Sequence, residues 1–522
     1  MKLSIIETSD VHGHISVESF REKGKKEAFS LSRAKTYIEK LRHKAQGPLI
    51  YIDNGDSIQG SPLANFYAKN QNPAPLMAAY KDLGLDAWVL GNHDFNYGRD
   101  YLKKAISYLE GRVLSANIKD ERGDLGIRPY LVKDYPGLRL GILGLTTQYI
   151  PHWEQEDHIQ GLAFTSALEA AKKYVPILRE EEGCDLVILS YHGGFERDLE
   201  GGQALEKLTG ENEGYQLLKS GLDFDVLLTG HQHGLHSGVY DGKALLQPGY
   251  RAEHLGQVDL DFDPKTKKIR VLQVGLVDLA SSFPDPDLEE AFGPPMDQVQ
   301  VLLDQESGLI DPPARIDSVI GAQVHGHPYI DLINQIQMDL TGAEVAATAI
   351  YKKDAPGLDR QVTLRAIMDN YPHNNTLTRI KIKGRDLKAL LESNANYFIL
   401  DGEGDLQVNP DYLYPKNTIF NYDIYSGIDY TYDYSQPKGS RLQEVLYRGH
   451  PLQDEEDLVF ATNSYRAKGG GDVPVLDGSQ ITYESSRELP EMIYDYIKER
   501  KKVTIKDYPG LHIRGYRKIK EE

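Results

Sequence analysis

The sequence predicts an α/β protein with two domains, and three features support this prediction. Five short apolar runs in the first half each end at a turn that carries side chains able to bind metal ions. Helical patterns, for example at residues 31–41 and 167–180, alternate with these runs up to about residue 280. Proline clusters then interrupt the chain, and a second half of different composition follows. Because strands that alternate with helices pack as layers, the first half is expected to be a layered α/β domain.

Length and composition exclude several classes of protein. At 522 residues the chain is longer than one hydrophobic core usually supports, so two domains are expected. No run approaches the ~20 apolar residues of a membrane helix, and we expect no membrane partner. The net charge of −19 argues against binding of a nucleic-acid polymer, which requires clustered Lys and Arg. A small anionic substrate still fits, provided that metal ions supply local positive charge.

The N-terminus and the single cysteine bear on location and redox chemistry. The first apolar run begins at residue 3, which leaves no room for the basic and apolar regions of a signal peptide. A cytoplasmic location is expected if Met1 is the native start, although a chain whose leader had been removed would look the same. Cys184 cannot form an internal disulfide and is expected to be a small buried hydrophobic residue.

The proline clusters set the expected domain boundaries. Prolines disfavour continuous helix or sheet and suit a connecting region, and here they occur at Pro284, Pro286, Pro294, Pro295, Pro312 and Pro313. We expect a metal-binding domain at residues 1–315 and a linker with a bridging helix at residues 316–340. The remaining residues, 341–522, contain a tyrosine-rich stretch and the triplet Gly469-Gly470-Gly471. This second half is expected to be a recognition domain.

Each apolar run has the features of a buried strand that ends at a sharp turn, with polar side chains close behind it. The runs at residues 3–6, 49–52, 88–90, 186–189 and 226–228 lead to seven such side chains: Asp10, His12, Asp56, Asn92, His192, His231 and His233. In open α/β sheets, ligands bind outside the carboxyl ends of the strands. We therefore expect these side chains to meet at one rim.

Together these side chains suit a site for two divalent metal ions. Oxygen and nitrogen donors are typical ligands of Mn, Zn, Fe or Co, and the choice among these metals stays open. Asp56 has two oxygens with which to bridge the ions, and Asn92 adds an oxygen without negative charge. Two ions about 3.5–4 Å apart can lower the pKa of a bound water to about 7 and clamp the oxygens of a phosphoester. His93 is placed to protonate the leaving alkoxide.

Each of these residues has an ordinary structural explanation when it is considered alone. Asp10 or Asp56 alone would be a turn former or a helix cap. His231 and His233 alone would favour neither interpretation. What favours a shared metal site is that five clusters all follow predicted strands.

Five motifs follow one another in the first half: Asp10-Val11-His12, Gly55-Asp56, Gly91-Asn92-His93-Asp94, His192 and Gly230-His231-Gln232-His233. In this order they resemble the motifs of the calcineurin-like metallophosphoesterases. The second half is similar to the C-terminal domain of the 5′-nucleotidase family, through Asn375-Thr376-Leu377 and the segment from Ala461 to Ala467. The resemblance implies a four-layer αββα first domain and a smaller α/β second domain, joined by a helical linker.

Within this family the chain looks more like the 2′,3′-cyclic-nucleotide 2′-phosphodiesterase/3′-nucleotidase branch. The support is the segment Asn92-His93-Asp94-Phe95-Asn96-Tyr97-Gly98, with Phe420-Asn421-Tyr422-Asp423 and Gly427-Ile428-Asp429-Tyr430. The 5′-nucleotidases pair the catalytic histidine with an aspartate three residues later, where this chain has Asn96. An amide can orient His93 but cannot stabilise its cation as a carboxylate would.

The resemblance also implies roles for individual residues. It assigns Asp10, His12, Asp56 and His233 to one metal ion, and Asp56, Asn92, His192 and His231 to the other. In relatives the second domain holds the base between two aromatic rings. Tyr465 matches one ring, Tyr422 is our choice for the other with Phe420 as its rival, and Asp472 matches an acid near the nucleoside.

From these features we expect a metallophosphoesterase whose substrate is a small nucleotide, either a 2′,3′-cyclic nucleotide or a nucleoside 3′-monophosphate. A metal-bound hydroxide would attack phosphorus in line, with His93 assisting departure of the ribose oxygen. The nearest alternative is a 5′-nucleotidase or a UDP-sugar hydrolase. An alternative of another class is a nucleotide-binding protein without catalytic activity.

Overall fold

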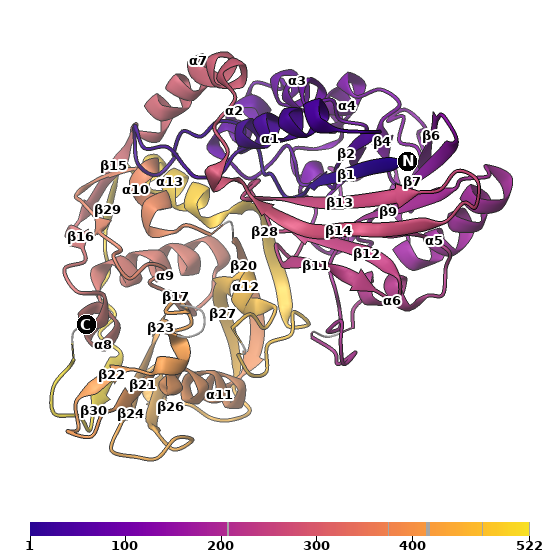
Figure 1. Ribbon diagram of the computed structural model, residues 1–522. Coiled ribbons are helices and arrows are strands. Elements are labelled where there is room, and N and C mark those ends of the chain that lie inside the picture. Colours follow the sequence, from indigo (N-terminus) through magenta and orange to yellow (C-terminus); the bar gives the residue numbers. More distant parts are fainter. Residues whose placement is uncertain (206–207, 374, 414–417, 472, 521–522) are drawn as a thin grey trace. The chain divides into compact units, whose positions relative to one another are not determined.

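A computed structural model describes the chain except residues 206–207, 374, 414–417, 472 and 521–522. The chain forms two compact units, Met1–Gln300 and Val301–Glu522 (Figure 1). The domain boundaries expected from the proline clusters, at residues 1–315, 316–340 and 341–522, stay a prediction. None of the described helices is both long and apolar enough to cross a membrane.

The first unit contains two six-stranded sheets. The first sheet has the order β14 (Ile269–Asp278), β13 (His254–Phe262), β1 (Lys2–Thr8), β2 (Leu49–Asp53), β3 (Ala87–Val89), β4 (Val113–Leu114). The second sheet has the order β11 (Leu235–Tyr240), β12 (Lys243–Pro248), β10 (Val226–Thr229), β9 (Leu186–His192), β7 (Leu138–Thr146), β6 (Tyr130–Tyr135). The strands from β1 to β4 are parallel, as are β7, β9, β10 and β12. The five predicted strands are thus parallel members of their sheets.

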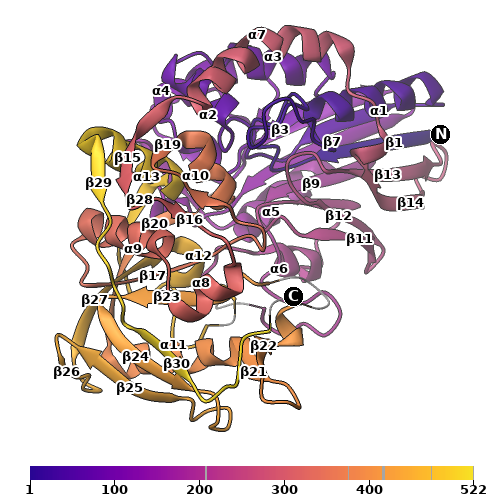
Figure 2. The same cartoon turned by 90° about the vertical axis from the view of Figure 1, so that its left-hand side faces the viewer.

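The two sheets share one apolar core, and helices cover their outer faces (Figures 1 and 2). Ile5, Ile50, Ile188 and Val226, two from each sheet, are fully buried in this core. On the outer face of the second sheet, Leu189 packs with residues of α5 (Ala167–Pro176) and α6 (Gly214–Lys219). On the side of the first sheet lie α1 (Leu31–Lys44), α2 (Pro62–Lys69), α3 (Ala74–Asp82) and α4 (Arg99–Tyr108). The first unit therefore has the αββα layers expected for it, and Cys184 is buried as predicted.

One of the proline clusters lies inside a helix, contrary to the expectation of an irregular connector. Helix α7 (Pro286–Leu303) runs through Pro294 and Pro295. Its buried side chains Leu288, Phe292 and Met296 recur at helical spacing, and the ring of Phe292 lies 6.3 Å from that of Tyr67 on α2. Burial of this stripe stabilises a helix that the prolines disfavour locally.

The second unit is built on a five-stranded sheet with smaller sheets around it. The large sheet has the order β23 (Asp423–Ser426), β17 (Val345–Ala349), β27 (Asp457–Asn463), β20 (Thr376–Lys383), β28 (Ile481–Glu488). A four-stranded sheet has the order β26 (His450–Pro451), β25 (Leu442–Tyr447), β24 (Ile428–Asp433), β30 (Leu511–Arg514), and a three-stranded one β19 (Gln361–Thr363), β15 (Glu306–Asp311), β29 (Lys502–Thr504). The helices are α8 (Val319–His325), α9 (Pro328–Thr341), α10 (Leu364–Asn370), α11 (Gly384–Asn394), α12 (Ser464–Ala467) and α13 (Leu489–Arg500).

Helix α9 and the tyrosine-rich stretch both contribute to the core of the second unit. The predicted helix near residues 329–340 is present as α9, and its Ile330, Ile333 and Ile336 are buried in this core. Tyr430 and Tyr432 of β24 are buried in the same cluster. The tyrosines of this stretch that the structure describes therefore serve mainly for packing.

Asp331 on α9 is an acidic side chain within this apolar environment. Burial raises its pKa to about 7; a backbone hydrogen bond from Tyr508 opposes the rise, and the charge of Asp507 adds to it. Because the folded state holds the proton more tightly than the unfolded state, stability contributed by the neutral form is lost as the pH rises from about 4 to about 7.

We predict that Asp331→Asn stabilises the protein at neutral and alkaline pH, because the amide stays uncharged. The gain in thermal midpoint over wild type should grow between about pH 4 and about pH 7 and then level off. Thermal unfolding followed by circular dichroism at several pH values checks this. An equal gain at every pH would contradict the proposed titration of Asp331.

Candidate metal centre

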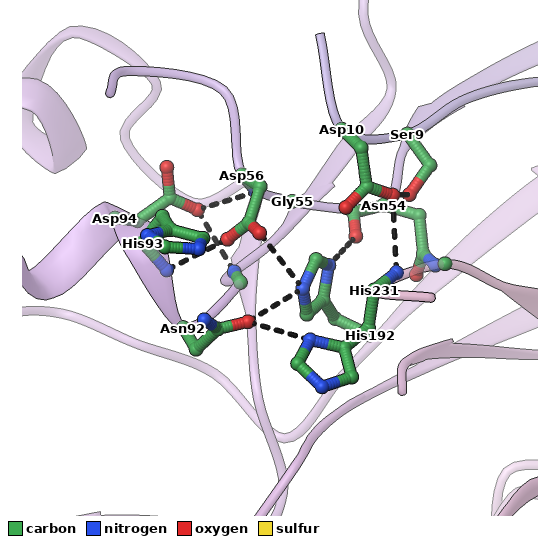
Figure 3. A network of polar contacts seen from close by, with 12 residues as sticks. Ser9, Asp10, Asn54, Gly55, Asp56, Asn92, His93, Asp94, His192 and His231 are labelled. Carbon is green, nitrogen blue, oxygen red and sulfur yellow. Dashed lines mark hydrogen bonds and ion pairs between the residues drawn. The ribbon is translucent and has the colours of Figure 1, made fainter. Parts of the chain in front are cut away.

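The seven side chains singled out by the sequence lie at the carboxyl ends of β1, β2, β3, β9 and β10. His192 is the last residue of β9, and the other six lie in the loops that follow their strands. Figure 3 shows five of them: Asp10, Asp56, Asn92, His192 and His231. The registers bring these ends together, because Thr8 pairs with Asp53 in the first sheet and Thr229 pairs with Tyr191 in the second. Asn54 joins the two sheets, since its backbone oxygen accepts a hydrogen bond of 2.6 Å from Nδ1 of His192. The prediction that five strands deliver these residues to one rim is confirmed.

The first group of candidate ligands consists of Asp10, His12 and His233. The Nε2 atoms of the two histidines lie 3.2 Å apart, and Nε2 of His233 lies 3.4 Å from Oδ1 of Asp10. This Oδ1 atom is buried and accepts no hydrogen bond from the described residues. One ligand atom from each residue lies within 4.8 Å of the others, which is the spacing of donors around a single ion.

The second group consists of Asp56, His192 and His231, with Asn92 beside them. Nε2 of His192 lies 3.3 Å from Oδ2 of Asp56 and 3.1 Å from Oδ1 of Asn92. The same oxygen of Asn92 lies 2.9 Å from Nδ1 of His231. Figure 3 shows these four side chains pointing toward one another.

The hydrogen bonds of the outer ring nitrogens determine which nitrogens face the centre. Nδ1 of His12 donates to the backbone oxygen of Gln59 at 2.9 Å, and Nδ1 of His192 donates to that of Asn54. When these rings are neutral, as a metal ligand must be, Nε2 therefore carries a lone pair. His231 has the opposite orientation, because its Nε2 lies 3.0 Å from Oε1 of Glu211, and Nδ1 faces Asn92.

Facing lone pairs and carboxylates repel one another unless a cation lies among them. The pKa of His192 reflects this repulsion. Burial lowers it and the carboxylate of Asp56 raises it, with a net rise to about 10. A proton is thus strongly favoured where the donors converge, and a divalent cation would satisfy the same donors. The residues present fit a site for two divalent metal ions.

The backbone is strained at most of the candidate ligands. Five of the seven have a positive φ between 51° and 69°: Asp10, His12, Asp56, His231 and His233. Residues with a Cβ rarely adopt this conformation, and such outliers cluster at functional sites. Close approach adds a second constraint, because a Cβ on Gly91 would lie 2.2 Å from Oδ1 of Asp56. The loops therefore adopt an unfavourable backbone conformation that places the side chains of the candidate ligands close together.

Asp94 holds two of these loops together, a role that we did not predict. Its carboxylate accepts hydrogen bonds from the backbone nitrogens of Gly91 at 2.8 Å, Asp56 at 3.1 Å and Ser57 at 2.9 Å. Its place in the motif Gly91-Asn92-His93-Asp94 was the only signal in the sequence. Glu211 was also missed, because nothing in the sequence around it indicates that it contacts His231.

His93 lies beside the second group without belonging to it. Its backbone nitrogen donates to Oδ1 of Asp56 at 2.7 Å, and its ring centroid lies 5.5 Å from that of His12. Nδ1 of the ring contacts Oδ1 of Asn96 at 2.7 Å. The expected role of His93 in proton transfer stays a prediction.

The residues expected to bind the base differ in their surroundings. The side chain of Tyr465 is 43% exposed, and its ring centroid lies 6.4 Å from that of the half-buried Phe420. Tyr422 is fully buried between Tyr397 and Phe398, so its ring has no face open to a base. The choice of Tyr422 is therefore wrong, and base binding by its rival Phe420 stays a prediction. Asp472 lies outside the described residues.

Comparisons with known proteins agree with this geometry. The calcineurin-like phosphoesterase family matches residues 3–235, and the 5′-nucleotidase C-terminal domain matches residues 314–478. A solved structure from Staphylococcus aureus, assigned as a 5′-nucleotidase and bound to alpha-ketoglutarate, is 33% identical, with a TM-score of 0.80. The match covers 98% of this chain and 100% of the other. The chain belongs to the 5′-nucleotidase family of calcineurin-like phosphoesterases.

Curated relatives of this family are similar over most of the chain. The 2′,3′-cyclic-nucleotide 2′-phosphodiesterase/3′-nucleotidase of Salmonella typhimurium is 27% identical, over 90% of this chain and 81% of its own length. The trifunctional nucleotide phosphoesterase of Bacillus subtilis is 25% identical over 97% of this chain, which spans 38% of that protein. Members of the family are phosphoester hydrolases with a dinuclear divalent metal site, as the sequence predicted.

We predict that His233→Gln weakens metal binding, because it removes one of three donors from the first group. Metal content measured by elemental analysis should fall from about two ions per chain to about one. The rise of the thermal midpoint on addition of Mn should also decrease.

His236→Gln is the matched control, since this histidine is three residues further along and exposed. Its metal content should equal that of wild type. Equal metal content in His233→Gln would contradict the assignment of the first group.

Proposed function

We propose that the protein is a metal-dependent hydrolase of 2′,3′-cyclic nucleotides and nucleoside 3′-monophosphates. The observation that carries this proposal is the convergence of two donor groups, with His93 beside them, at one rim of the first unit. The substrate class is supported by the names of relatives such as the Salmonella typhimurium enzyme.

In this proposal Asp10, His12 and His233 hold one metal ion, and Asp56, Asn92, His192 and His231 hold the other. When bound, two such ions supply an activated water and neutralise the oxygens of the phosphoryl group. Asp56 also acts electrostatically on His12 of the other group, which suits a bridging carboxylate.

The protein's own groups then arrange the substrate and move a proton. The amide oxygen of Asn92 contributes a donor without adding negative charge against an incoming phosphate. The backbone nitrogen of His93 donates to Asp56 and its ring contacts Asn96, so the ring is oriented beside the donors. From there its Nε2 would give a proton to the departing ribose oxygen.

The second unit would recognise the nucleoside. Tyr465 and Phe420 offer aromatic faces from neighbouring positions, and stacking accepts any base. Together with Asp472, these residues complete the proposed substrate-binding set.

We predict that Tyr465→Ala raises KM for 3′-AMP while kcat changes little, because the lost stacking acts on binding alone. A loss of about 1–3 kcal/mol corresponds to an increase in KM of about 5- to 150-fold. Steady-state kinetics check this. Tyr483→Ala is the matched control, since Tyr483 is also 43% exposed in the second unit. An equal KM for the two variants would exclude stacking on Tyr465.

A 5′-nucleotidase, or a hydrolase of nucleotide sugars such as UDP-sugars, is the second candidate. It is favoured by the Staphylococcus aureus structure and by the 5′-nucleotidase of Vibrio vulnificus, which is 29% identical over 44% of this chain. The presence of Asn96 in place of the usual aspartate favours the first candidate.

Phosphate release from 3′-AMP, 2′,3′-cyclic AMP and AMP with Mn tests the proposal. 2′,3′-cyclic AMP should yield phosphate by way of 3′-AMP. The kcat/KM values for 2′,3′-cyclic AMP and for 3′-AMP should each exceed that for AMP by at least about tenfold. Preference for AMP would support the second candidate. Tight binding of all three without turnover would indicate a nucleotide-binding protein.

A further inference from the structure

Asn96 lies between His93 and the buried carboxylate of Glu154. Oδ1 of Asn96 contacts Nδ1 of His93 at 2.7 Å, and Nδ2 of Asn96 donates to Oε2 of Glu154 at 2.5 Å. The other oxygen of Glu154 lies 2.8 Å from Nδ1 of His158. The side chain of Glu154 is only 2% exposed. A neutral amide thus separates the imidazole from a charge that solvent barely screens.

The hydrogen-bond chemistry of these groups permits one arrangement. An ionised carboxylate only accepts, so the NH2 group of Asn96 must face Glu154. The amide oxygen must then face His93, and Nδ1 of His93 must carry a proton to donate to it. Nε2 is left as the ring nitrogen that can exchange a proton with a substrate. The position of Glu154 therefore determines the tautomer of His93.

The segment that carries Glu154 is packed against the metal centre. It follows the short helix η2 (Ile150–His152), and the backbone nitrogen of Glu154 donates to the oxygen of Ile150 at 2.9 Å. The ring of the adjacent Trp153 lies 5.4 Å from that of His231. On the other side, a Cβ on Gly98 would lie 3.3 Å from the ring of His158. The hydrogen bonds of Glu154 to Ile150, Asn96 and His158 hold the carboxylate in place.

We infer that Glu154 is a positioning residue for the proposed hydrolysis and acts on His93 through the amide of Asn96. Its negative charge polarises the amide, which strengthens the hydrogen bond that Asn96 accepts from the imidazole. No proton passes along this path: Nδ1 keeps its proton, and only Nε2 donates one to the oxygen released from phosphorus. The inference rests on the proposed function.

Exchanging the amide of Asn96 and the carboxylate of Glu154 by substitution is the sharpest test. Glu154→Gln keeps the size and the acceptor facing Asn96 but removes the charge, so kcat for 3′-AMP with Mn should fall about tenfold with KM unchanged. Asn96→Asp alone places two carboxylates in contact and should cost more than this. The double variant N96D/E154Q again pairs one carboxylate with one amide and should return to within about threefold of wild type.

Recovery in the double variant is an outcome that a merely structural role of Glu154 does not produce. Glu182→Gln is the matched control, since Glu182 is a half-buried, hydrogen-bonded glutamate of the same unit. It should leave kcat unchanged. Elemental analysis should find the same metal content in all variants, which separates an effect on His93 from loss of ions.

Two results would overturn the inference while leaving the proposed function intact. One is an active wild type with Glu154→Gln equal to it in kcat. The other is a double variant whose loss equals the product of the two single losses. Failure of the proposed function is distinct, because the wild-type protein would then either prefer AMP over 3′-AMP and 2′,3′-cyclic AMP or release nothing from these substrates and bis-p-nitrophenyl phosphate with Mn.

Discussion

The convergence of lone pairs and carboxylates at one rim is the constraint on which the first unit depends. Ring nitrogens lie 3.1 Å from an amide oxygen and 3.3 to 3.4 Å from carboxylate oxygens there, a spacing that favours positive charge among them. The left-handed backbone of five candidate ligands and the close approach at Gly91 are conformational costs of the same arrangement. Asp94 and Asn54 offset part of this cost by hydrogen-bonding the loops to each other.

Hydrogen bonds from outside the centre orient the rings of the candidate histidine ligands. Nδ1 of His12 and of His192 is bound to backbone oxygen, and Glu211 orients His231 from outside. This outer layer determines which ring nitrogen of each histidine faces the centre. In the proposed role of Glu154, Asn96 and Glu154 orient His93 in the same way.

The strand ends and the candidate ligands were predictable because the signals are local. A buried parallel strand shows a continuous apolar run, and its end shows glycine and polar residues within a few positions. Helix α9 was predictable for a similar reason, since its periodicity is contained in one segment. Helix α7 was not, because the buried stripe through Phe292 outweighs the local effect of Pro294 and Pro295.

By itself, the sequence determined the α/β class of the first unit, the five strands and the seven side chains that follow them. Only the tertiary structure decided that Tyr422 is buried in the core, that Asp94 joins two loops, and that Glu154 stands behind Asn96. The physical reason is that periodicity and turn chemistry act between neighbours along the chain. Burial and hydrogen bonding between loops depend instead on residues far apart in sequence, such as Asn96 and Glu154, which meet only when the loops pack.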